Sequence, residues 1–234
     1  MFVLGVDTAT ACAVVGATAD GEVVRETAVA PRPDGRPRHS EVLLPEIERA
    51  VDAAGGWSRI DRIAIGIGPG SFTGLRIGIA TARALAQARQ IPLAPIGSLA
   101  ALARGISAAG LPDERALPVF DARRNEAFAA LFEGAEEIWQ PFVAAPEGLV
   151  ARVRELDGTP LAAGDGALRF AAELETAGAT VAPPENPIHR VAARHVCAVG
   201  EAAVEAPTNQ IQPLYLRPPD AKRWRERDRR AEPG

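Results

Sequence analysis

The first thirty residues carry three short apolar runs that are separated by turn signals. The first run spans 2–6, the second spans 11–17, and residues 22–30 alternate in character after the turn dipeptide Asp20-Gly21. Two such runs joined around Asp-Gly are typical of a β-hairpin. The pattern therefore predicts a three-stranded meander at the start of the fold.

Helical spacing begins after a proline-rich loop at 31–37. Within 39–54, apolar residues recur at i, i+4, i+7 and i+11, namely Leu43, Ile47, Ala50 and Ala54. Pro45 interrupts this pattern, so the helix either starts near Leu43 or begins at Ser40 with a kink. The following elements are a strand at 60–67, a helix at 71–90, a strand at 93–96 and a short helix at 97–105. This order predicts an α/β layer with a parallel portion.

The same kind of pattern restarts after Pro112. It predicts strands at 116–121, 126–132, 137–142 and 160–163, helices at 146–156, 168–177 and 189–205, and an extended segment at 211–216. Both halves thus begin with a meander and continue into α/β units, although no sequence repeat relates them. We expect a first lobe at 1–105, a smaller second lobe at 106–216 and a basic tail at 217–234.

Composition places the chain among cytoplasmic proteins without a membrane span. Apolar residues make up 47% of the sequence, but no run approaches the ~18 residues that a membrane helix needs. Asp7 directly follows the first apolar run, which argues against a signal peptide. Cys12 and Cys197 belong to no metal-binding spacing and fit buried thiols in a reducing compartment.

Charge is distributed unevenly along the chain. The net charge of −4 gives no footprint for strong nucleic-acid binding. Residues 217–230 carry seven basic and three acidic side chains, so this segment is +4 and the remainder is −8. It is either a solvated chain end or a tail that contacts RNA or an acidic partner.

The segment GPGSFTGLRIG at 68–78 lies between a predicted strand and a predicted helix. Gly68 and Gly70 would allow close backbone approach to a ligand, and Ser71 would cap the helix. Free N–H groups at a helix start favour an anion such as phosphate, to which Arg76 would add charge unless it faces a partner. The alternative is a tight turn with close helix–sheet packing, because neither a Walker A loop nor GxGxxG is present.

Asp7, Thr8 and Thr10 form a second candidate at the end of the first strand. A carboxylate followed by hydroxyls suits a metal-bound water and phosphate oxygens. The alternative is an Asx- or ST-turn that closes the hairpin.

Small residues define a third candidate. Gly74, Gly78 and Ala82 recur every four residues, so another helix could pack closely against them. Together with the apolar stripe of 39–54, they would form a helix–helix interface between subunits, or else be buried within the monomer. The three histidines, His39, His189 and His195, form no i,i+4 pair or zinc spacing and suit capping or packing.

Five segments resemble the TsaB (YeaZ) family, in order along the whole chain except its last dozen residues. They are GVDTAT at 5–10, HSEVLLP at 39–45, IGIGPGSFTGLRIGIATARALA at 65–86, VFDARRNEAFAALF at 119–132 and PLYLRPPDA at 213–221. The resemblance implies an α/β fold of the actin/Hsp70/sugar-kinase type, with two ribonuclease-H-like lobes.

The resemblance also implies a function. Members are paralogues of TsaD, which transfers a threonylcarbamoyl group to the adenosine beside the anticodon of tRNA. This chain would be a non-catalytic subunit that binds and activates TsaD, or forms a homodimer without it. TsaE, an ATPase, would join the pair, and TsaC would supply the threonylcarbamoyl-adenylate. Contact with tRNA would be indirect or through the basic tail.

The residues argue against catalysis. His39 matches one histidine of the paralogue's metal pair, but Leu43 stands where the second would be, so no metal site is expected. The turn 121–123 lacks the glycine of a second phosphate loop, which leaves at most weak or partner-shared ATP or ADP binding. The alternatives are a weak ATPase or kinase-like enzyme of this fold, and the metallopeptidase that the family's glycoprotease label would imply.

The resemblance assigns two sets of residues. A vestigial nucleotide cleft would contain Asp7, Thr8, Thr10, Gly68, Gly70 and Ser71. A partner interface would contain His39, Leu43, Leu44, Ile47, Ala50, Phe72, Thr73, Gly74, Leu75, Arg76, Gly78 and Ala82.

Overall fold

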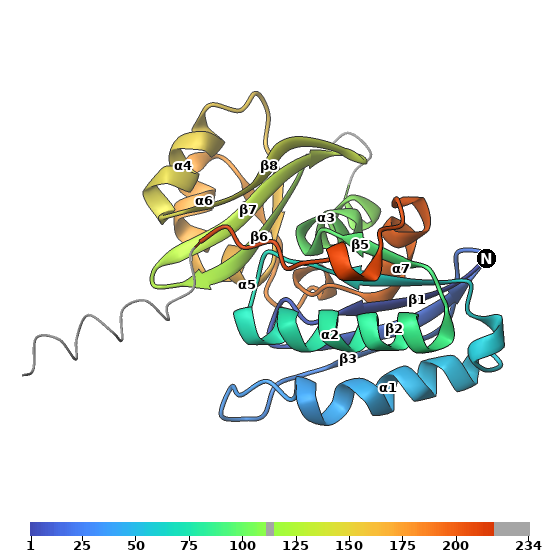
Figure 1. Ribbon diagram of the computed structural model, residues 1–234. Helices are drawn as coiled ribbons and strands as arrows, with labels where there is room; N and C mark the ends of the chain where they lie inside the picture. The colour runs from blue at the N-terminus through green and yellow to red at the C-terminus, as the bar shows by residue number, and fades with distance from the viewer. Residues whose placement is uncertain (111–114, 218–234) are drawn as a thin grey trace, which may run out of the picture.

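Two five-stranded sheets form two lobes in the computed structural model, which describes residues 1–110 and 115–217 (Figure 1). The strands of the first sheet are β1 (Phe2–Asp7), β2 (Ala13–Ala19), β3 (Glu22–Val29), β4 (Arg62–Gly66) and β5 (Leu93–Ile96). The strands of the second are β6 (Ala116–Arg123), β7 (Glu126–Glu133), β8 (Glu136–Ala144), β9 (Leu161–Ala163) and β10 (Thr180–Val181).

The two sheets have the same topology. Their strand orders are β3-β2-β1-β4-β5 and β10-β9-β6-β7-β8. In each, three antiparallel strands come first and two parallel strands follow. The predicted duplication, a meander followed by α/β units in each half, is confirmed.

Helices cover the sheets on both faces. They are α1 (His39–Ala53), α2 (Phe72–Arg89), α3 (Ser98–Ala109), α4 (Pro146–Arg154), α5 (Asp165–Arg169), α6 (Ala171–Ala177) and α7 (Ala193–Ala202). Helix α1 packs against β2 and β3, and α2 packs against β4 and β1 on the same side of the first sheet (Figure 1). Because α1 begins at His39, Pro45 lies inside it, and the later start near Leu43 is wrong.

Helix α7 returns the chain to the first lobe. It packs against β1, β2 and β4, although the sequence placed 106–216 in the second lobe. Glycines make this close contact: a Cβ atom at Gly5 would lie 2.7 Å from Sγ of Cys197, and one at Gly200 would lie 2.2 Å from Cβ of Ala64. The strands of the two sheets thus lie on either side of residue 105, whereas α7 packs on the first sheet, and the lobe bounds stay a prediction.

Helix α3 joins the two lobes through one continuous core. Its buried residues Leu99, Leu102 and Ile106 belong to the same cluster as Phe120 and Phe128 on the inner face of the second sheet. Alternate residues on those strands point to the outer face, where α4 and α6 cover a separate core. The lobes are thus connected by packing as well as by the chain.

Two predicted helices differ in the structure. The helix predicted at 168–177 is divided into α5 and α6 at Phe170, whose side chain is buried and whose backbone angles, −111° and 30°, leave the α region. The helix predicted at 189–205 is reduced to α7, preceded by a 3-10 turn at Pro187–His189. The segment predicted to be extended at 211–216 belongs to neither sheet.

Docking of α7 predicts a steric effect at Gly200. We expect Gly200→Ala to lower the free energy of unfolding by about 1–3 kcal/mol, because the added methyl group overlaps Ala64 in a filled core. Gly148→Ala is the matched control in α4, where the new Cβ atom would lie 3.4 Å from Ala144. Urea unfolding of both variants measures the difference, and equal effects would contradict close packing of α7.

Candidate functional site

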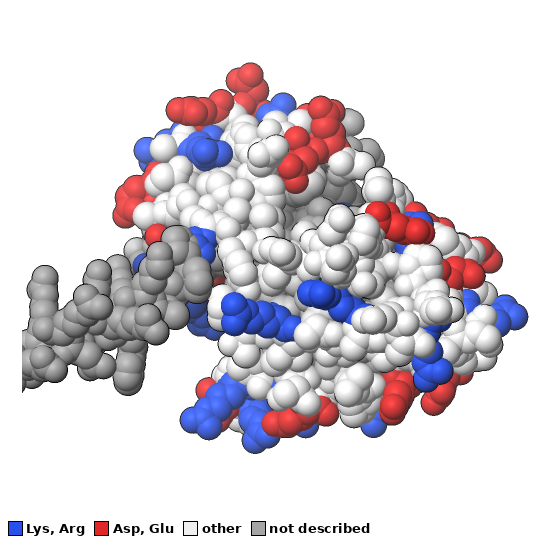
Figure 2. Space-filling model, viewed as in Figure 1, with Lys and Arg blue, Asp and Glu red and all other residues white. Residues whose placement is uncertain are grey.

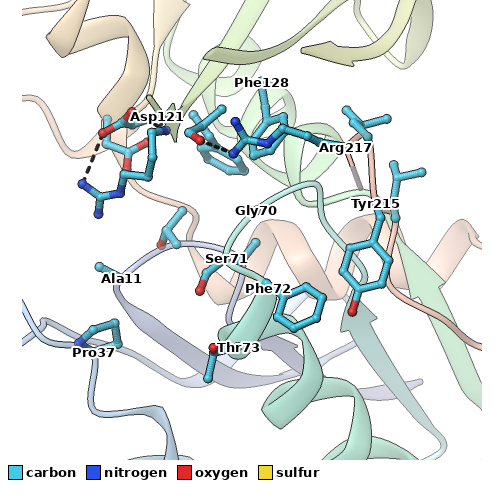
Figure 3. A pocket seen from close by; sticks show the side chains of 18 residues that line it. Ala11, Pro37, Gly70, Ser71, Phe72, Thr73, Asp121, Phe128, Tyr215 and Arg217 are labelled. Carbon is cyan, nitrogen blue, oxygen red and sulfur yellow. Dashed lines mark hydrogen bonds and ion pairs between the residues drawn. The ribbon is translucent and has the colours of Figure 1, made fainter. Parts of the chain in front are cut away.

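A cavity of about 460 Å³ lies between the lobes, at the N-terminal end of α2 (Figure 3). Its walls come from the β1–β2 turn, the start of α2, the β6–β7 hairpin and the segment that ends at Arg217. The lining residues are Ala9, Thr10, Ala11, Pro37, Gly70, Ser71, Phe72, Thr73, Phe120, Asp121, Ala122, Arg123, Phe128, Asp165, Leu214, Tyr215, Leu216 and Arg217. Three of the six predicted cleft residues, Thr10, Gly70 and Ser71, line it.

The glycine-rich loop is held against the β1–β2 turn by its own backbone. Ser71 N–H donates to the carbonyl of Ala9 at 2.7 Å, and a Cβ atom at Gly70 would lie 2.3 Å from that oxygen. The Ser71 hydroxyl accepts from Gly74 N–H at 3.2 Å, which confirms the predicted N-cap. Two of the amides that would receive a phosphate are therefore bonded within the chain. Gly68, with φ of 105°, lies behind the cavity wall.

Asp7 and Thr8 also lie behind the wall, fully buried. The Asp7 carboxylate accepts from the Ser98 hydroxyl at 2.5 Å and from Ala9 N–H at 2.8 Å, the latter being an Asx turn. Burial raises the pKa of Asp7, and these two hydrogen bonds only partly oppose the shift. Thr8 donates its hydroxyl to the carbonyl of Gly74 at 2.8 Å. The alternative of a turn-closing role describes Asp7, whereas Thr8 bonds to α2, and neither residue faces the cavity.

Charged side chains of the second lobe, which were not among the predicted cleft residues, also line the cavity. Asp121 accepts from Arg169 at 2.9 Å and forms an ion pair with Arg123. Asp165 accepts Asp121 N–H at 3.0 Å, and burial is the main cause that raises the pKa of Asp165. The quoted segment VFDARRNEAFAALF contained Asp121 and Arg123, but no sequence spacing connects them to Asp165.

Arg217 completes the wall at the end of the described chain. Its guanidinium pairs with the Glu126 carboxylate, donates to the carbonyl of Ala122 at 2.6 Å, and lies 5.8 Å from the ring centroid of Phe128. Figure 3 shows Arg217 beside Phe128 and across the cavity from Ser71. Both arginines that line the cavity, Arg123 and Arg217, are thus paired with carboxylates of this chain.

This set of residues does not fit the phosphates of a nucleotide. Two carboxylates and two paired arginines leave the lining without net positive charge, whereas a triphosphate requires unpaired donors and cations. Asp7, the expected ligand for a metal-bound water, is bonded inside the wall. Weak or partner-shared ATP or ADP binding stays a prediction.

Most of the predicted partner interface is buried inside the monomer. Eight of its twelve residues are buried, namely His39, Leu43, Ile47, Ala50, Gly74, Leu75, Gly78 and Ala82. The glycines contact the β1–β2 turn, since Cβ atoms at Gly74 and Gly78 would each lie 2.2 Å from an oxygen of Thr8. His39 lies 3.1 Å from the carbonyl of Thr10 through Nε2, and burial lowers its pKa. These eight residues are thus buried within the monomer, and a role of this set in a partner interface stays a prediction.

Four predicted interface residues remain exposed, Leu44 on α1 and Phe72, Thr73 and Arg76 on α2. We call these four residues the α1–α2 face. Leu44 is 53% exposed and Phe72 is 37% exposed. The Arg76 guanidinium lies 3.8 Å from the ring centroid of Phe72. Large apolar side chains beside a stacked arginine are typical of protein–protein contact.

Helix α2 is basic on its outer side. It contains Arg76, Arg83 and Arg89 and no acidic residue. Over residues 1–110 and 115–217, no carboxylate forms an ion pair with any of these three arginines. Figure 2 shows basic atoms surrounded by uncharged surface over α2, with acidic atoms farther away. This surface complements a neutral or acidic partner.

Two further findings concern metal and membrane. Within the described residues, no group of three or more histidine, cysteine or acidic side chains could hold a metal ion. His39 has Leu43 as its neighbour one helical turn on, and Leu43 points into the core. None of the helices in the described part of the chain is long and apolar enough to span a bilayer.

Comparison with known proteins gives consistent matches over most of the chain. The family model "TsaD: tRNA N6-adenosine threonylcarbamoyltransferase" matches residues 26–208. The tRNA threonylcarbamoyladenosine biosynthesis protein TsaB of Escherichia coli is 32% identical over 172 residues, which cover 71% of this chain and 72% of that protein. An uncharacterized protein of Mycobacterium leprae is 36% identical over 94% of this chain, but this chain spans only 56% of that relative's length.

Solved structures give the same result for the fold. YeaZ from Pseudomonas aeruginosa matches with a TM-score of 0.73 and 25% identity, covering 92% of this chain and 99% of that one. The ROK hexokinase from Thermus thermophilus matches with a TM-score of 0.53 and 15% identity, covering 86% and 99%, which shows the fold alone. The predicted two-lobed fold of the actin/Hsp70/sugar-kinase type is confirmed.

The raised pKa of Asp7 predicts a pH-dependent stability difference. Above the unfolded pKa of about 3.9, the unfolded carboxyl ionises while the folded one stays protonated, so Asp7 destabilises the fold increasingly until pH passes its folded pKa. The amide of an asparagine would not ionise, so we expect the stability of Asp7→Asn relative to wild type to increase as pH rises from about 4.

Urea unfolding of both proteins between about pH 4 and 8 measures this difference. Ser98→Ala is the companion variant, because loss of the hydroxyl removes the hydrogen bond that lowers the Asp7 pKa and should widen the pH window. A stability difference between Asp7→Asn and wild type that does not vary with pH would show that Asp7 is not protonated inside the fold.

Proposed function

The chain belongs to the TsaB (YeaZ) family, whose TsaB members are tRNA threonylcarbamoyladenosine biosynthesis proteins, and we propose that it is a non-catalytic subunit that binds and activates TsaD. TsaD would perform the threonylcarbamoyl transfer to the adenosine beside the anticodon of tRNA. TsaE would join this pair as its ATPase, and TsaC would supply the threonylcarbamoyl-adenylate. Without TsaD, a second copy of this chain would occupy the same face.

The observation that carries the proposal is the α1–α2 face. Leu44 and Phe72 expose large apolar side chains on two neighbouring helices, and burying them against a partner would stabilise the complex. Two helices side by side also offer ridges into which helices of a partner can pack. Arg76, which has no acidic residue beside it on α2, favours an acidic group on the partner.

The absence of catalysis is proposed on the geometry of the cleft. A kinase-like or ATPase mechanism needs a carboxylate and phosphate-binding groups that face the nucleotide. Here Asp7 is bonded to Ser98, and the cavity arginines are paired with Asp121 and Glu126. A metallopeptidase needs several metal ligands, whereas His39 is bonded to Thr10 and lacks a second histidine at Leu43. Activation of TsaD through docking needs none of these groups.

Two predictions concern the basic tail and the cellular location of the protein. Residues 218–234 contain most of the basic tail and lie outside the described residues, so its contact with tRNA stays a prediction. The cytoplasmic location also stays a prediction.

The proposal is tested by reconstitution. We expect purified TsaD, TsaC and TsaE to form threonylcarbamoyladenosine on tRNA only when this protein is added, and we expect the protein alone to form none and to hydrolyse no ATP. Mass spectrometry of digested tRNA measures the product. Equal modification without the protein, together with ATP turnover by the isolated chain, would instead favour the enzyme alternative.

The α1–α2 face predicts a binding defect with a matched control. We expect Leu44→Glu to raise the dissociation constant for TsaD at least about tenfold, because a carboxylate would replace an apolar side chain that the partner covers in the complex. Ile138→Glu is the control, since Ile138 is 40% exposed on β8 of the second lobe. Isothermal titration calorimetry measures both. Wild-type affinity of Leu44→Glu would place the interface elsewhere.

A further inference from the structure

Residues 211–217, which we call the strap, pass from the first lobe to the second along one wall of the cavity. Ile211 is buried in the core, and Leu214 N–H donates to the carbonyl of Ile67 at 2.8 Å. Residues 214–217 of the strap line the cavity. The strap is thus attached to the first lobe at its beginning, next to the glycine-rich loop.

Tyr215 attaches the middle of the strap to α2. Its ring lies 5.2 Å from that of Phe72, and its hydroxyl accepts from Nε of Arg76 at 3.0 Å. The Arg76 guanidinium lies over the Phe72 ring, so the three side chains form one stacked cluster. Tyr215 is 40% exposed, and Figure 3 shows it beside Phe72 at the mouth of the cavity. The strap therefore extends the α1–α2 face by one aromatic residue.

Arg217 attaches the end of the strap to the second lobe. Its guanidinium bonds to the Glu126 carboxylate and to the carbonyl of Ala122, which belong to the β6–β7 hairpin. Charge-assisted hydrogen bonds of this kind are stronger than neutral ones, and the pair is partly shielded from water. Two residues of one short segment thus connect the exposed end of α2 with the opposite lobe.

We propose that the strap is part of the TsaD-binding surface and also a tie between the lobes, so that docking on Phe72, Arg76 and Tyr215 is coupled to the opening of the interlobe cleft. A partner that packs on Tyr215 fixes the strap against α2, and Arg217 transmits this restraint to the second lobe. By linkage, the lobe orientation that favours the Tyr215 cluster also favours the partner. The identity of the partner rests on the proposed function, whereas the tie between the lobes does not.

The experiment measures the distance between the lobes in the full-length protein. Spin labels are attached at Glu201→Cys on α7 and Glu136→Cys on β8, both exposed positions away from the α1–α2 face, in a Cys12→Ser background that retains the buried Cys197. Double electron–electron resonance then gives the distance distribution with and without TsaD. Calorimetry gives the affinity for TsaD of the same proteins.

Arg217→Met and Tyr215→Phe are the test variants. The first keeps an apolar stem over Phe128 but removes both charged hydrogen bonds, and the second removes only the hydroxyl that accepts from Arg76. Arg115→Met is the matched control, because Arg115 forms an ion pair with Glu133 inside the second lobe. Thermal unfolding verifies that each variant is folded at the temperature of measurement.

We expect Arg217→Met to broaden the interlobe distance distribution of the free protein, and TsaD to narrow the distribution of wild type. We also expect Arg217→Met to weaken TsaD binding by about threefold to tenfold, Tyr215→Phe to weaken it less, and Arg115→Met to change neither quantity. An unchanged distance distribution in folded Arg217→Met would overturn the proposal. If TsaD does not bind even the wild-type protein, the proposed function fails, while the distances in the free variants still decide whether the strap ties the lobes.

Discussion

The close approach of α2 to the β1–β2 turn is the constraint on which the rest of the first lobe depends. Gly70, Gly74 and Gly78 each bring the backbone so near to Ala9 or Thr8 that a methyl group would overlap an oxygen atom. The Thr8 hydroxyl and Ser71 N–H bond across this contact. The glycines face the β1–β2 turn, and the other side of α2 faces solvent. Phe72 and Arg76 lie on that exposed side, at the N-terminal end of the helix. The glycine-rich motif therefore packs α2 against the β1–β2 turn, and this packing sets which residues of α2 remain exposed.

This constraint explains which parts of the site could be predicted from the sequence. The N-cap at Ser71, the helix that follows and the meander at the start of each lobe depend on local patterns, and all are confirmed. The direction in which a small-residue stripe faces is not a local property. The period of Gly74, Gly78 and Ala82 identified one side of the helix, but only the position of Thr8 decides that this side is internal.

The remaining differences arise from contacts between distant segments. The helical pattern near 189–205 predicted a helix but not the sheet on which it packs. The close contact of α7 with the first sheet depends on Gly5 in β1 and Gly200 in α7, which are far apart in the sequence. The cavity combines Asp121, Asp165 and Arg217, whose separations in sequence follow no motif. Such groupings depend on the arrangement of the lobes, which the resemblance supplied and periodicity did not.

The duplicated topology places one aspartate at the same position in each sheet, and both aspartates form hydrogen bonds within their own lobe. Asp7 near the end of β1 and Asp121 near the end of β6 hold equivalent places in the two sheets, and each accepts the N–H of the residue two positions on. In the first lobe the second oxygen of Asp7 accepts from Ser98, and in the second lobe Asp121 accepts from Arg169. A carboxylate that completes a turn and holds another side chain is committed to its own lobe rather than to a ligand in the cleft. Both acids are therefore bonded within their own lobe, and the exposed helices and the strap are the surfaces to which the proposed function assigns the partner.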